Sequence, residues 1–330
     1  MSNQIHLKIK INNMRKKLLS IAAIAAIVFF GACSNEERLP EQEQTFTFTA
    51  SMPEVRPTTM VALEEDGKDI VLTWEMDDVL QVVVVSNGEE YTGTATVNEI
   101  TDDGKKAVFE TSSPLPAGTF DFYGVYGGGG LSSTNPTNAL LTVAPSTSGS
   151  LEEVEDNKDV MLYFAAEGVT SDDIVNGVVF NHLGSLFKIT VQNNCPTGTL
   201  DLQQALLENT DEEWAYNFSE TGTVFDLKTK TFQNTGTKIN SISFTTTTET
   251  IAPGDSVEYW SWYPILPDNT WPELKFRMIN ANPSGDLVTV NSKPARITTT
   301  NPVIAGKNYR FYASFNGTDL NFTNDQFVVE

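Results

Sequence analysis

Hydrophobic and polar residues alternate one by one in several parts of the chain, most strictly in residues 46–52. This segment places Phe46, Phe48, Ala50 and Met52 on one face of a β-strand and hydroxyl side chains on the other. Runs rich in β-branched and aromatic residues, separated by turn residues, predict further strands. These runs are residues 70–74, 79–85, 91–97, 106–110, 119–125, 178–180, 186–191, 222–225, 241–245, 256–263, 274–279, 287–290 and 308–315. Short strands at such intervals predict an all-β protein built from β-sandwiches.

Helical periodicity is rare, and only residues 200–207 suggest a short helix. Two polar stretches, residues 127–137 and 145–158, are interpreted as loops. The first is unsuited to cradling a phosphate, because Asn135 and Pro136 stand where a helix would have to follow the glycines. Helices are therefore expected to contribute little to the fold.

The length and composition predict two domains. A chain of 330 residues with 40% hydrophobic residues is long enough to form two separate cores. We place the boundary in the polar segment 167–173. The prediction is therefore an N-terminal β-sandwich over residues 45–170 and a C-terminal β-sandwich over residues 171–330.

The longest apolar run lies near the N-terminus, at residues 18–30, directly after the basic residues Arg15, Lys16 and Lys17. It is shorter than the roughly 20 residues that a membrane-spanning helix needs. A basic segment followed by a short apolar run is typical of a secretory signal peptide. We therefore expect residues 1–32 to be a signal peptide that is removed on export.

A pair of small residues stands directly before Cys33 and resembles the lipobox of bacterial lipoproteins. This resemblance implies lipidation of Cys33 by acyl chains such as palmitate, which together make attachment to a membrane stable. Residues 33–44 would then form an acidic tether, and its Glu36 and Glu37 resemble a surface-export signal of Bacteroidota lipoproteins. The alternative to lipidation is an ordinary signal peptide in which Cys33 is incidental. The alternative to a surface-export signal is a plain solvated tether.

Charge and residue usage narrow the possible functions. The formal net charge is −22, and residues 1–32 carry basic but no acidic side chains, so the exported chain is still more acidic. Such a chain repels phosphate backbones, which argues against nucleic-acid binding. Once Cys33 is lipidated, Cys195 is the only remaining thiol of the exported chain, and His182 is its only histidine. Neither a disulfide, a zinc site of several His or Cys ligands nor a cofactor site is therefore predicted.

No motif nominates a catalytic residue. A Ser-His-Asp triad would depend on His182 alone, and its apolar flanks favour a structural role. Three acidic pairs lack the alternating oxygen ligands of a calcium loop and are interpreted as solvated turns. These pairs are Asp77 with Asp78, Asp102 with Asp103, and Asp156 with Asp159.

An aromatic cluster occurs in residues 259–263, with Trp271 nearby. Trp260 and Trp262 could stack on sugars, but they lie on the strand face opposite Tyr259 and Tyr263. Burial on both sides of a core strand explains this pattern as well, and we favour it. Immediately before the cluster, Ser256 lies in an Asp-Ser-Val sequence that resembles the O-glycosylation motif of exported Bacteroidota proteins.

Several segments together resemble the fimbrillins, the type V pilin subunits of Bacteroidota with their tip and anchor proteins. The resemblance rests on the lipoprotein start and on residues 46–52, 56–59, 71–80, 180–191 and 304–312. It implies two transthyretin-like or immunoglobulin-like β-sandwich domains. It also implies lipid anchoring at the outer membrane surface and polymerisation with other pilin subunits by strand exchange.

The function that follows from this resemblance is a non-enzymatic pilus subunit, either stalk, tip or anchor, with possible adhesion to a host or bacterial surface. The alternative is a surface glycan-binding lipoprotein of a polysaccharide-uptake system. In that case Trp260, Trp262 or Trp271 would provide the stacking faces.

In the family scheme a protease cuts after an arginine and removes the first strand. The candidates here are Arg38 and Arg56, and Pro57 should make cutting after Arg56 slow. A cut after Arg38 would release the protein from its lipid but leave the first strand in place. This favours an anchor, cap or tip over a stalk. The C-terminal residues 321–330 could donate a strand, but self-pairing is favoured by the Asn-Gly turn before them.

Overall fold

The structure is a computed structural model, and its description covers most of the chain from residue 46 onward. The described residues are 46–53, 62–66, 69–111, 113, 115–142, 147–209, 213–216, 223–233, 238–245, 247–264, 273–281, 286–296 and 303–329. All of them belong to one compact unit, Glu43–Glu330. The predicted signal peptide, the tether, Cys33, Arg38, Arg56 and Trp271 lie outside the described residues.

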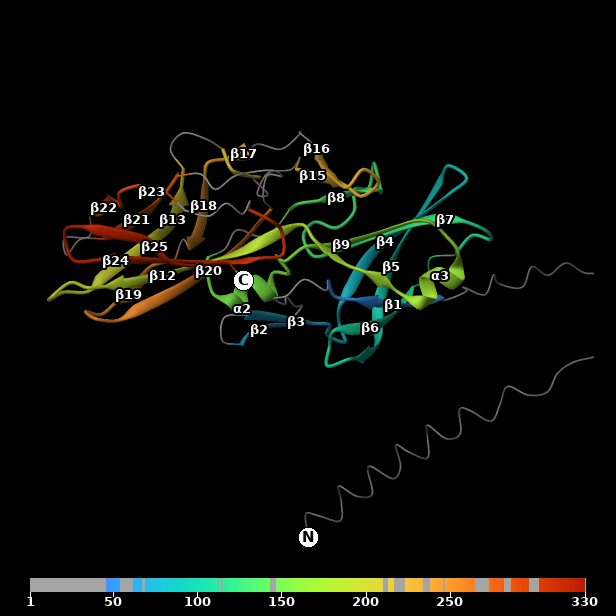
Figure 1. The fold of residues 1–330 in the computed structure, drawn as a ribbon, viewed down its shortest axis with the longest axis horizontal. Helices are drawn as coiled ribbons and strands as arrows, with labels where there is room; N and C mark the ends of the chain where they lie inside the picture. The colour runs from blue at the N-terminus through green and yellow to red at the C-terminus, as the bar shows by residue number, and fades with distance from the viewer. Residues whose placement is uncertain are drawn as a thin grey trace, which may run out of the picture. The chain divides into compact units, whose positions relative to one another are not determined.

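Strands dominate the described part of the chain, and the two helices there are short (Figure 1), so the all-β prediction is confirmed. Neither helix of the described part is long and apolar enough to cross a bilayer. The largest sheet has eight strands in the order β10-β1-β6-β5-β4-β7-β9-β11. Their bounds are β1 (Phe46–Ser51), β4 (Val79–Ser86), β5 (Glu89–Thr101), β6 (Lys106–Thr111), β7 (Phe120–Tyr126), β9 (Leu162–Val169), β10 (Val178–Val179) and β11 (Asn181–His182).

The core face of this sheet is built from the alternating apolar residues that the sequence predicted. Trp74, which directly follows β3 (Asp69–Thr73), is 2% exposed and meets the rings of Phe109 and Phe180 at centroid distances of 5.0 and 5.2 Å. Both contacts are edge-on, the geometry that aromatic quadrupoles favour. The core thus joins residues far apart in the sequence.

Two further sheets are formed mainly by the second half of the chain. One has the order β20-β12-β24-β25, and the other has the order β18-β13-β21-β22, with β19 also paired to β13 and β23 also paired to β21. Their bounds are β12 (Gly184–Asn193), β13 (Leu200–Glu208), β18 (Ser241–Thr245), β19 (Glu249–Ile251), β20 (Ser256–Pro264), β21 (Glu273–Ala281), β22 (Leu287–Asn291), β23 (Ala295–Arg296), β24 (Asn308–Phe315) and β25 (Leu320–Val329).

Small sheets complete the architecture. They are β2 (Ala62–Asp66) with β3 (Asp69–Thr73), β14 (Ala215–Tyr216) with β17 (Lys238–Ile239), and β8 (Asn138–Leu140) with β15 (Val224–Asp226) and β16 (Thr231–Gln233). Strands from the two sides of the predicted boundary at 167–173 pair with one another. β8 pairs with β15, β10 pairs with β1, and β11 pairs with β9. The division into domains 45–170 and 171–330 stays a prediction.

The helix expected at residues 200–207 is wrong, because this segment forms β13. It lies between β21 on one side and β18 and β19 on the other, and this long-range pairing overrides the local preference. Conversely, helix α2 (Leu151–Asp156) lies in a stretch expected to be a loop. Helix α3 (Ser171–Asn176) begins in the predicted boundary segment.

Both helices begin at hydroxyl caps that the sequence analysis missed. The side chain of Ser150 accepts a hydrogen bond from the backbone N–H of Glu153, and Thr170 forms a capping box with Asp173. A Ser or Thr followed three residues later by an acidic residue is the local signal for such a start. The predicted self-pairing of the C-terminal tail is confirmed, since β25 pairs antiparallel with β24.

Candidate functional site

The first strand, β1, is held mainly from one side. It pairs antiparallel with β6 along its whole length, from Phe46 opposite Thr111 to Ser51 opposite Lys106. On its other side the strand pairing is confined to Ala50 and Ser51, which run parallel to β10. The backbone of β6 therefore depends on β1 for its partner along one entire edge.

Alternate side chains of β1 enter the core of the eight-stranded sheet. Phe48 is 1% exposed, Ala50 is 0% exposed and Met52 is 8% exposed, while Phe46 is half-buried against the same core. The Phe48 ring lies 5.2 Å from that of Phe122 and 6.1 Å from that of Phe164, measured between centroids. The predicted face of this strand is thus confirmed as a core face.

Together these contacts define the β1 groove, the space between the β6 edge and the rings around Phe48. Main-chain hydrogen bonds give such a groove affinity for a strand, and pockets for alternate side chains give it specificity. Without β1, the unpaired N–H and C=O groups of β6 would form an open sheet edge, which readily accepts another strand. The arrangement is thus suited to binding an extended segment, whether from its own chain or from another.

The aromatic cluster of β20 belongs to the core. Trp260 is 4% exposed and Trp262 is 2% exposed, which confirms the core interpretation for both residues. The Trp260 ring is covered by the ammonium group of Lys188, 4.9 Å from the ring centroid, and Lys188 is paired with Glu258 at 2.6 Å. Neither tryptophan offers a free face for stacking on a sugar.

Ser256 and His182 differ in their surroundings. Ser256 is the first residue of β20 and has an exposed side chain, but its glycosylation stays a prediction. His182 pairs with Leu162 across β11 and β9, and burial lowers the pKa of its imidazole to about 4. The ring is therefore neutral at physiological pH. Within the described ranges no group of three or more His, Cys, Asp or Glu side chains is arranged to hold a metal ion.

Two acidic side chains expected in solvated turns are buried, so that interpretation is wrong for Asp78 and Asp159. Asp78 accepts a hydrogen bond from the Glu75 backbone N–H at 2.7 Å and pairs with Lys158 at 3.4 Å. Burial nevertheless raises its pKa from 3.8 to about 6. For Asp159, burial and then the charge of Glu153 raise the pKa from 3.8 to about 7. No local pattern in the sequence indicates the burial of Asp78, because its partner Lys158 lies 80 residues further along the chain.

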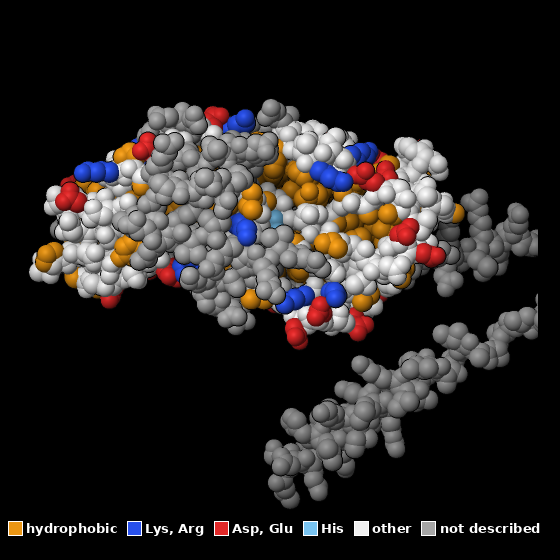
Figure 2. Space-filling view, viewed as in Figure 1, with side chains coloured by type: hydrophobic (Ala, Val, Ile, Leu, Met, Phe, Trp, Pro, Cys, Tyr) orange, Lys and Arg blue, Asp and Glu red, His pale blue; other side chains and the backbone are white. Residues whose placement is uncertain are grey.

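On the face of the molecule drawn in Figure 2, acidic and basic side chains are interspersed across the described surface. Patches of apolar side chains lie between them. The described residues of this face form no extended basic area, as expected for a chain whose formal net charge is −22.

A comparison with known protein families includes three of the segments that carried the resemblance, residues 71–80, 180–191 and 304–312. The family model described as fimbrillin-like matches residues 58–325. A search of curated proteins found no match.

Among solved structures, a candidate cell adhesion protein from Bacteroides uniformis is 13% identical, with 86% of this chain and 97% of that chain covered and a TM-score of 0.47. One from Bacteroides ovatus is 14% identical, with 87% and 97% covered and a TM-score of 0.46. The fimbrial anchor protein Mfa2 from Porphyromonas gingivalis is 10% identical, with 87% and 95% covered and a TM-score of 0.39.

Proposed function

Because the chain belongs to the fimbrillin-like family, we propose that it is a non-enzymatic subunit of a surface fimbria and joins its neighbours by strand exchange at the β1 groove. The observation that carries this proposal is the double attachment of β1. Its backbone pairs with β6 at every residue, and its alternate side chains fill core pockets. A neighbour's strand with the same alternation would satisfy both.

Processing of the N-terminus decides the place of the subunit in the fimbria. A chain that starts at Cys33 keeps its lipid and β1 and acts as an anchor or cap on the outer membrane. A chain that starts at Leu39 has lost the lipid and acts as a tip. A chain that starts at Pro57 has lost β1, and its open groove receives a strand as a stalk subunit does.

Cysteine pairs across β1 and β6 test strand exchange directly. Thr47 lies opposite Glu110, so cysteines at these two positions are close enough to form a disulfide. We would express two single variants in the same cells, Thr47→Cys and Glu110→Cys, each with Cys195→Ser, and oxidise intact cells. If a neighbour donates its own β1, disulfide-linked dimers appear on a non-reducing gel, because Thr47→Cys in the donated strand then lies opposite Glu110→Cys of a chain whose β1 has been removed.

A matched control pairs Thr47→Cys with Lys106→Cys, since Lys106 lies opposite Ser51 and is out of register with Thr47. This control should give no dimers. Sequencing the N-termini of the recovered bands assigns the role, with starts at Cys33, Leu39 and Pro57 as the distinguishing results. The proposal is wrong if all processed forms are monomeric and the in-register cysteines never join two chains.

A further inference from the structure

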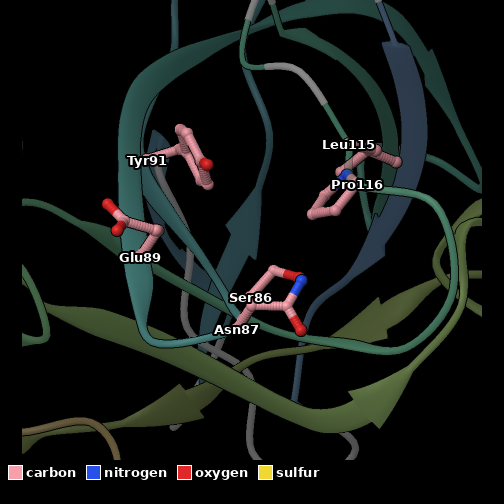
Figure 3. Close-up of a pocket in the computed structure, with 6 residues that line it drawn as sticks. All are labelled: Ser86, Asn87, Glu89, Tyr91, Leu115 and Pro116. Atoms are coloured by element: carbon pink, nitrogen blue, oxygen red, sulfur yellow. The ribbon is translucent and has the colours of Figure 1, made fainter.

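A pocket of about 340 Å³ lies at the tip of the hairpin formed by β4 and β5, at the end of the core face of the eight-stranded sheet. The hairpin side and the loop after β6 face each other across it (Figure 3). Its volume is in the lower part of the range found for small-ligand sites. The lining residues are Ser86, Asn87, Glu89, Tyr91, Leu115 and Pro116.

The hairpin wall of the pocket is formed around a tight two-residue turn. Asn87 and Gly88 have φ angles of +53° and +83°, the signs that a two-residue type I′ turn requires. Residue 90 points to the opposite face of the strand, where Glu90 is paired with Lys228 at 3.0 Å. The turn therefore sets the course of the backbone from which Asn87, Glu89 and Tyr91 extend, and the partly exposed ion pair adds a contact on the opposite face.

The opposite wall depends on a close approach between the hairpin and the loop after β6. A Cβ atom added to Gly93 would lie 2.9 Å from the Cβ of Ser113, so the loop can come this near because residue 93 is glycine. Gly93 lies two residues after Tyr91 on the same face of β5. The missing side chain therefore brings Leu115 and Pro116 opposite the Tyr91 ring.

The chemistry of the lining is amphipathic. Tyr91 is 43% exposed and offers a ring face with a hydroxyl, while Leu115 and Pro116 offer an apolar wall. The Asn87 amide and the Ser86 hydroxyl can both donate and accept hydrogen bonds, and Ser86 as a residue is 6% exposed. The lining has no cationic side chain and carries the Glu89 carboxylate at its rim, which disfavours anionic ligands.

The geometry points to this pocket as a binding site for a neutral saccharide. The apolar C–H face of a sugar ring would stack between Tyr91 and Pro116, and its hydroxyls would exchange hydrogen bonds with Asn87 and Ser86. This inference deepens the proposed function, since it names the ligand class through which an adhesive fimbrial subunit would contact a surface. The site differs from Trp260 and Trp262, the two described tryptophans considered in the sequence, which are buried.

Saturation-transfer difference NMR on the purified protein tests the inference, with methyl glycosides of glucose, galactose and N-acetylglucosamine as neutral probes. Glucuronic acid and lysine serve as the anionic and cationic probes. We expect at least one neutral glycoside to bind and the anionic probe to fail. Tyr91→Ala should weaken binding about tenfold or more, because it removes the stacking face. Asn87→Gly should weaken it several-fold while keeping the turn, since glycine also adopts positive φ.

The matched control is Thr92→Ala, which changes an exposed neighbour on the opposite face of β5 and should leave binding intact. Circular dichroism melts of all variants report whether they remain folded. The inference is overturned if no neutral glycoside binds, if lysine alone binds, or if binding survives Tyr91→Ala. If disulfides between chains still form in that case, strand exchange remains supported. The failure of the saccharide proposal can therefore be distinguished from the failure of strand exchange.

Discussion

Replacing Asp159 by asparagine removes a carboxylate that the fold buries at a cost. Asp159 is 4% exposed, and its Oδ1 atom has no hydrogen-bond partner among the described residues. Glu153 adds a second negative charge nearby. An asparagine side chain has nearly the same shape as that of aspartate but carries no charge. We therefore expect Asp159→Asn to stabilise the protein at neutral pH.

The pKa of Asp159 sets the size and the sign of this effect. Burial and Glu153 raise the pKa from 3.8 to about 7, so the folded state binds the proton more tightly than the unfolded state. The free energy of unfolding is then highest below the unfolded pKa and falls as the pH rises through the folded pKa. At about 1.4 kcal/mol per pH unit, this carboxylate costs up to roughly 4 kcal/mol at pH 8. Asp159→Asn should remove this contribution to the decrease in the free energy of unfolding with rising pH.

Urea unfolding followed by tryptophan fluorescence, at several pH values from 4 to 8, measures the difference. The stability gain of Asp159→Asn over the wild type should be small at pH 4 and grow by a few kcal/mol toward pH 8. Asp156→Asn is the matched control, because Asp156 lies three residues earlier and is exposed. Its curve should run parallel to that of the wild type. Parallel curves for Asp159→Asn as well would refute the reasoning, since Asp159 would then be ionised at no cost.

Three further predictions test the core and the turn by urea unfolding. Phe48→Ala should lower the free energy of unfolding by about 3–5 kcal/mol, whereas Thr47→Ala on the exposed face should change it by less than about 0.5 kcal/mol; equal effects would contradict the assigned face. Trp260→Ala should also lower it by about 3–5 kcal/mol and leave saccharide binding of the folded fraction unchanged, and selective loss of binding would restore this tryptophan as a ligand platform. Gly88→Ala should lower it by about 1 kcal/mol through backbone strain alone, since φ is +83° and nothing lies within 4 Å of the added Cβ; an unchanged stability would exclude the type I′ turn.

Strands were predictable where the alternation is unbroken. Residues 46–52 alternate without interruption, and β1 covers Phe46–Ser51 of this segment with the expected buried face. In β13 the register shifts between Leu202 and Gln204 and again between Ala205 and Leu206. The first shift inserts residue 203 into β13, whereas the second leaves the extra residue, Phe244, in β18. The insertion breaks the two-residue period of β13, so its apolar residues resemble a helical stripe. The false helix at residues 200–207 follows from this irregularity.

The burial of single polar residues was not predictable, because it depends on distant segments. Asp78 resembles its exposed neighbour Asp77 in every local respect, yet its partner Lys158 lies 80 residues further along the chain. The saccharide pocket has the same origin. Tyr91 and Pro116 meet because Gly93 lets a loop approach, and no short motif encodes that approach. The candidate strand could thus be predicted from the sequence, whereas the candidate pocket required the structure.

The β1 groove and the pocket share one structural element, the end of β6. Phe46, the first residue of β1, lies opposite Thr111, the last residue of β6. Thr111 also accepts a hydrogen bond from the Ser113 backbone N–H through its hydroxyl, at 3.1 Å, and Ser113 is the residue that packs against Gly93. A strand that fills the groove therefore supports the segment from which the pocket loop departs. Under both proposals, the subunit with a filled groove is the one whose saccharide site is fully formed, so assembly and adhesion would favour the same state of the protein.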